Sequence, residues 1–151
     1  MDYRAQHTYR RQQKHRLYAF TVFLTLLSAS LPLMPSGLAD PPNLTLMYLS
    51  GGMFWVGCVG VIAIAVRMAR VLRDVSKGMH TTIGLWHFFQ NPAACVFDIL
   101  LFIGLSGFLF TRLWAEATLW PFLFLSLFIF SFGMHCMLNG SHYTYIYNKG
   151  E

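Results

Sequence analysis

Four stretches of this 151-residue chain are each long and apolar enough to cross a lipid bilayer, and no other feature constrains the fold as strongly. A membrane-spanning helix needs roughly 17–25 mostly apolar residues. Composition agrees, because 11% of the residues are charged, against about 25% in soluble domains. We expect an all-α integral membrane protein, a single antiparallel bundle of four transmembrane helices at residues 17–34, 44–66, 93–113 and 120–138.

The connections between the spans are short. Residues 1–16 form a basic lead that is expected to be interfacial or extended. Beyond residue 66 the second helix is predicted to continue into the cytoplasm, because apolar residues recur there at helical spacing and Gly78 is a natural stop. Residues 79–90 are apolar and aromatic but too short to span, which predicts an interfacial helix before the third span.

Charge predicts the orientation. Basic residues gather before the first span and between the second and third, whereas residues 35–43 contain none. By the positive-inside rule, both termini are cytoplasmic in a cell (inner or plasma) membrane. Topology and anionic lipid headgroups account for the net charge of +5, so we expect the lipid bilayer as a partner and no nucleic acid. The basic residues are Arg4, Arg10, Arg11, Lys14 and Arg16, then Arg67, Arg70, Arg73 and Lys77.

Several local signals mark helix ends. Pro32 and Pro35 are expected to end the first span, which we expect to be retained because its apolar run is long for a signal peptide. Asn43 is a predicted N-cap for the second span. Asn91-Pro92 and Trp120-Pro121 each place a proline at the expected first helical position, directly after an N-cap residue. This pattern predicts the starts of the third and fourth spans.

The second span is rich in small residues, with Gly51, Gly52, Gly57 and Gly60 within ten positions. Small residues let neighbouring helices approach closely in a membrane. Two interpretations are open. The glycines either pack inside this subunit or form a face for another subunit.

Asp98 is the one acidic residue within an apolar span. A carboxylate costs about 2.5–3.5 kcal/mol at the bilayer centre, so it should face protein or water. His135 comes to a similar depth on the following antiparallel helix, which predicts a hydrogen-bonded pair. The pair is either a polar clasp between two helices or a proton relay or ion site.

Cys95 and Cys136 fall at the same end of the third and fourth spans as this pair. Their spacing with Asp98 and His135 matches no recognised zinc pattern. In addition, the adjacent residues His135 and Cys136 would point about 100° apart on a helix. The chain also lacks the CxxC motif of membrane thiol oxidoreductases. We therefore expect no metal and no cofactor.

After the fourth span, Asn139-Gly140-Ser141 is expected to end the helix. Tyr143, Tyr145 and Tyr147 then alternate with other residues at strand periodicity in a cytoplasmic tail. The tyrosines either form an aromatic belt at the inner surface or an extended segment that docks onto a partner.

Three functions fit these features. The leading one is a noncatalytic subunit or scaffold of a membrane protein assembly; the second is a homo-oligomeric channel or small-solute transporter that uses Asp98. The third is a membrane-embedded enzyme in which Asp98 and His135 are the acid and base. The architecture resembles small multidrug transporters, but the buried glutamate of their first helix has no counterpart between Leu17 and Met34, so the family is not assigned.

Overall fold

The computed structural model describes residues 3–79, 92–114 and 119–149, and their regular structure is entirely α-helical. The helices are α1 (Tyr3–Gly37), α2 (Leu44–Met79), α3 (Pro92–Trp114) and α4 (Trp120–Lys149). Each contains a segment long and apolar enough to cross a membrane: Lys14–Gly37, Leu44–Arg70, Pro92–Leu113 and Trp120–Asn139. The prediction of four apolar spanning helices is confirmed.

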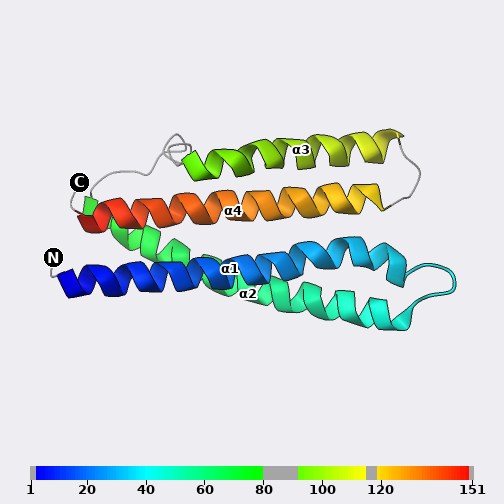
Figure 1. Cartoon of the computed structure of the whole chain (residues 1–151), viewed down its shortest axis with the longest axis horizontal. Helices are drawn as coiled ribbons and strands as arrows, with labels where there is room; N and C mark the ends of the chain where they lie inside the picture. The colour runs from blue at the N-terminus through cyan, green and yellow to red at the C-terminus, as the bar shows by residue number, and fades with distance from the viewer. Residues whose placement is uncertain (1–2, 80–91, 115–118, 150–151) are drawn as a thin grey trace.

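Consecutive helices run in opposite directions (Figure 1). α1 packs along α2, and α3 packs along α4. α4 also lies against α1 and contacts α2, whereas within the described residues α3 packs on α4 alone. α4 therefore joins the α1–α2 hairpin to α3.

The buried core lies where α1, α2 and α4 meet. Its largest contributors come from all three helices, with long flexible methionines filling the space between them. α3 takes part only at the edge of this core, where Phe97 packs against it and faces Phe130 of α4, with ring centroids 6.2 Å apart. The core residues are Phe20, Leu24, Met68, Met134 and Met137.

Glycines allow the closest helix contacts. A Cβ atom added to Gly57 of α2 would lie 2.6 Å from the backbone nitrogen of Leu27 on α1. A Cβ atom on Gly104 of α3 would lie 2.7 Å from the backbone nitrogen of Phe128 on α4. Because backbone cannot yield as a side chain can, both hairpins depend on a missing side chain at these points.

The predicted starts of α2 and α4 are found. The Asn43 side-chain oxygen accepts a hydrogen bond from the Leu46 backbone N–H at 3.1 Å, which confirms it as the N-cap of α2. α4 begins at Trp120, as predicted. The described part of α3 begins at Pro92, and Asn91 lies outside the described residues. The described part of α2 runs through the predicted stop at Gly78 to Met79.

The prediction that Pro32 and Pro35 end the first span is wrong, because α1 continues through both prolines to Gly37. A proline has no N–H, so Pro32 leaves the carbonyl of Ser28 without its helical donor. The hydroxyl of Ser126 on α4 donates to that carbonyl at 2.7 Å. A neighbouring helix thus supplies the hydrogen bond that proline removes, as occurs in other membrane-spanning helices.

Two further corrections concern the ends of the chain. α1 begins at Tyr3, so the basic lead is helical rather than extended. α4 continues through Asn139-Gly140-Ser141 to Lys149, so the tail is helical rather than strand-like. Extending an existing helix adds one hydrogen bond for each residue fixed, and this outweighs a weak stop signal. Residues 80–90 of the predicted interfacial helix lie outside the described residues.

The Ser126 contact predicts a dependence on Pro32. Ser126→Ala should lower the free energy of unfolding in mixed micelles by about 1 kcal/mol, because the Ser28 carbonyl loses its donor. In a Pro32→Ala background the same change should cost much less, since the N–H of the introduced alanine reaches that carbonyl within the helix. Thr25→Ala is the control, because the Thr25 hydroxyl bonds only within α1, to the Thr21 carbonyl. Equal costs of Ser126→Ala in the two backgrounds would contradict this account.

Candidate polar site between α3 and α4

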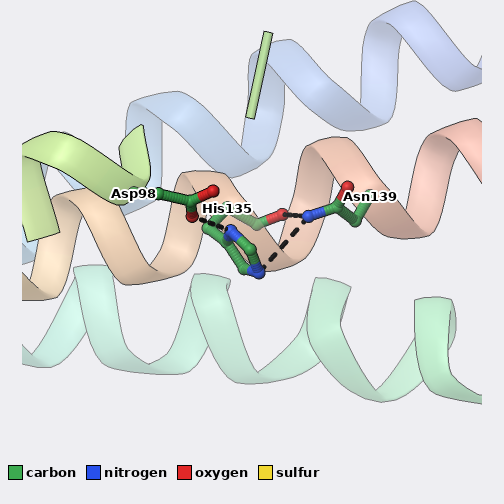
Figure 2. Close-up of polar contacts among 3 residues, drawn as sticks. All are labelled: Asp98, His135 and Asn139. Atoms are coloured by element: carbon green, nitrogen blue, oxygen red, sulfur yellow. Dashed lines mark hydrogen bonds and ion pairs between the residues drawn. The ribbon is translucent and has the colours of Figure 1, made fainter. Parts of the chain in front are cut away.

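Asp98 and His135 are in direct contact. Figure 2 shows the Asp98 carboxylate of α3 directed at the His135 ring of α4, with Oδ1 paired to Nδ1. The side chains are 20% and 12% exposed, respectively. The structure therefore brings together the two residues that the sequence places at one depth, and it gives the intramembrane carboxylate a protein partner.

Helix packing sets this register. Gly104 of α3 faces Phe128 of α4, and Gly107 faces Phe124. Residue numbers therefore rise along α3 in the direction in which they fall along α4. Asp98 stands six residues before Gly104, and His135 seven residues after Phe128. The glycine contacts in the middle of the hairpin thus fix the level at which the polar pair meets.

Asn139 completes the site and was missed by the sequence analysis. It stands one turn after His135, is 1% exposed, and its side-chain nitrogen donates to the His135 carbonyl at 3.0 Å. The same nitrogen lies 3.3 Å from Nε2 of His135. The spacing of four residues on one helix could have revealed Asn139, but its place in a turn-like Asn-Gly-Ser sequence pointed to a helix end.

The three side chains form a directed polar chain (Figure 2). The side-chain nitrogen of Asn139 donates to Nε2 of His135, and Nδ1 of His135 is paired with the carboxylate of Asp98. This arrangement orients the ring and gives the carboxylate a partner in a region where water is scarce.

The predicted cysteines lie on the same helices as this pair. The side chains of Cys95 and Cys136 are both exposed. Within the described residues, no group of three His, Cys, Asp or Glu side chains is placed to hold a metal ion.

The predicted glycine face divides into two parts. Gly57 and Gly60 meet α1, at Leu27 and Phe23 respectively. A Cβ atom added at Gly51 or Gly52 would meet nothing within 4 Å. The first pair therefore packs inside the chain, and the second pair lies open.

The three tyrosines of the predicted docking tail lie on the last turns of α4, and their side chains are outside the described residues. Helical geometry puts positions 143 and 147 on one side of α4 and position 145 on the other. The strand-like alternation of the sequence therefore does not produce one continuous row of tyrosine positions.

Comparison of the chain with protein-family models, curated proteins and solved structures gives no match. The class of protein rests on the four helices themselves. The chain is a small multi-pass membrane protein.

The polar contact predicts an energetic coupling between α3 and α4. In a double-mutant cycle, Asp98→Ala and His135→Ala should show a coupling free energy of about 0.5–2 kcal/mol for unfolding in micelles. The matched cycle of Asp98→Ala with Thr25→Ala, a polar residue on α1, should show none. Purely additive costs for Asp98 and His135 would contradict a direct interaction.

Proposed function

We propose that this protein is a noncatalytic subunit or scaffold of a membrane protein assembly. In this proposal it crosses a cell membrane as an antiparallel four-helix bundle with both termini in the cytoplasm. The end of α2 extends beyond the membrane. The basic residues next to the first span and after the second support this orientation.

The pairing of Asp98 is the observation that carries the proposal. Asp98 is the one Asp or Glu within the four candidate spans, and its carboxylate contacts His135 inside the same chain. Substrate and ion paths through membranes need polar groups that face the path. A carboxylate occupied in joining two helices supports a structural role, so we assign Asp98 and His135 to a polar clasp.

The clasp matters because α3 packs on a single described helix. Among the described elements α3 packs on α4 only, and many of its apolar side chains are exposed to the surroundings. In hydrocarbon, apolar contact alone gives little preference for a protein neighbour over lipid. A polar pair holds α3 in place and leaves its remaining faces for lipid or for another protein.

A candidate partner face lies on the first half of α2. Gly51 and Gly52 are open, and beside them Tyr48 and Leu49 are more than half exposed. An open glycine pair flanked by larger side chains allows a second helix to approach the α2 backbone closely. We assign this face, together with the tyrosine-bearing end of α4, to contact with other subunits.

This assignment predicts the effect of added bulk. Gly52→Leu should leave the four helices folded, because nothing lies within 4 Å, and should remove most of the partner from the purified complex. Quantitative mass spectrometry of the copurifying chains measures that ratio. Ala65→Leu adds bulk at another exposed position of α2 and should leave the ratio unchanged. Unchanged partner stoichiometry in Gly52→Leu would contradict this partner face.

The second candidate is a homo-oligomeric channel or transporter, and one observation favours it. Asp98 keeps 20% of its side-chain surface exposed, and it ends a polar chain through His135 to Asn139. One copy is too small to enclose a pore, so several copies would have to contribute Asp98 to a shared path.

Flux separates the two candidates. The scaffold account predicts that proteoliposomes with the wild-type chain carry no more protons or small cations than empty vesicles, and that Asp98→Asn retains the assembly. Wild-type flux that disappears in Asp98→Asn, with the particle mass unchanged, would replace the scaffold by the conduit.

A further inference from the structure

An apolar groove runs along the surface between α1 and α2, with a cavity volume of about 540 Å³. This volume falls within the range of about 300–1,000 Å³ typical of small-molecule sites. One wall is Phe23 of α1, and α2 supplies the rest of the lining from Trp55 to Ile64. Trp55 at the far end is 69% exposed.

The groove follows from the sequence of α2. Gly60 has no side chain, and the Phe23 ring of α1 lies where its Cβ would stand. Val59 and Ala63, on either side of Gly60 along the helix, are exposed and too small to fill the space above that ring. The result is an apolar groove that is open to the surroundings of the helix.

Two arginines continue this face of α2 beyond the groove. Arg67 and Arg70 follow Ala63 by four and seven residues, so they lie on the same side of the helix, and both are exposed. Arg70 is the last residue of the candidate span. The apolar groove therefore ends in positive charge at the membrane edge.

The helix register adds a third guanidinium. Gly57 meets Leu27 and Gly60 meets Phe23, so residue numbers fall along α1 in the direction in which they rise along α2. Arg67 follows Gly60 by seven residues, about two helical turns, and Arg16 precedes Phe23 by the same number. The two arginines therefore stand at the same level on the facing sides of α2 and α1. Arg16 is partly buried.

We propose that this groove binds an anionic glycerophospholipid. Its phosphate lies among Arg16, Arg67 and Arg70, and one acyl chain lies in the groove. Guanidinium groups bind phosphate oxygens through paired, charge-assisted hydrogen bonds. Basic sites between membrane helices near the cytoplasmic surface are recognised positions for anionic headgroups.

Dimensions support a lipid rather than a soluble phosphate compound. From Arg67 to Trp55 the helix rises by about 18 Å, close to the roughly 15 Å of one hydrocarbon leaflet. A ligand that matches both features carries a negative headgroup and an apolar tail of leaflet length. Free phosphate would use the arginines and leave the groove without an occupant.

The proposal can be tested with Trp55 as the probe. A Trp86→Phe, Trp114→Phe, Trp120→Phe variant, which keeps Trp55, is reconstituted in phosphatidylcholine bilayers. The bilayers contain brominated phosphatidylglycerol or brominated phosphatidylcholine. Because bromine quenches tryptophan at contact range, Trp55 should be quenched several-fold more efficiently by the anionic lipid at equal mole fraction. Equal quenching by the two lipids would overturn the proposal.

Charge variants locate the headgroup. Arg67→Gln and Arg70→Gln, made separately, should each lower the preference for phosphatidylglycerol by about five-fold, as expected for one lost guanidinium near a membrane surface. Arg112→Gln removes the same charge near the end of α3 and should leave the preference unchanged. A preference that survives both α2 variants, or falls equally with Arg112→Gln, would overturn the headgroup assignment.

A variant without a charge change tests the groove itself. Ala63→Phe should fill the lining and lower quenching by the anionic lipid to the level of phosphatidylcholine, while the circular dichroism spectrum stays unchanged. Quenching by neither lipid in the wild type means that a protein surface covers Trp55, either a second copy or another subunit. That outcome also overturns the lipid assignment, and it leaves the subunit proposal standing.

Discussion

The need to satisfy every polar group inside hydrocarbon governs the contacts of this protein. Water is not available there to bond a free carbonyl or carboxylate, so each must find a partner in the chain. Two such demands are met by hydrogen bonds or ion pairs between helices. Pro32 leaves the Ser28 carbonyl without a helical donor, and Ser126 supplies one. Asp98 introduces a carboxylate, and His135 meets it.

Residues of α4 supply the partner of both the Ser28 carbonyl and the Asp98 carboxylate. The arrangement of the helices therefore depends on α4. One side carries Ser126 and the core methionines toward α1 and α2. Another side carries His135 toward α3. The polar contacts give direction to helices that apolar packing alone would hold weakly. A small membrane protein thus gains a defined shape from a few hydrogen bonds and several glycine contacts, which suits a subunit that presents fixed faces to others.

Much of this was predictable from local sequence. The lead and the tail were missed because helix extension outweighs weak local stop signals, whereas the error at Pro32 involves a distant contact. Hydropathy and start signals such as Asn43 depend on neighbours within a few residues, so the spans and their beginnings were predicted well. The hydroxyl that bonds the Ser28 carbonyl at Pro32 comes from Ser126, far along the chain, and no local pattern contains it. The similar depth of Asp98 and His135 followed from the predicted topology. That the two side chains face each other depends on how the glycines of α3 pack against α4. The division between packed Gly57 and open Gly52 likewise depends on where α1 lies.

The central claim is that this chain works as part of a larger membrane assembly. The most direct test is the mass of the particle extracted into nanodiscs from its native membrane, measured by native mass spectrometry with every chain identified. The account predicts a second protein in fixed stoichiometry with this one. A particle that contains this chain alone, as a monomer or as a symmetric oligomer, would contradict it.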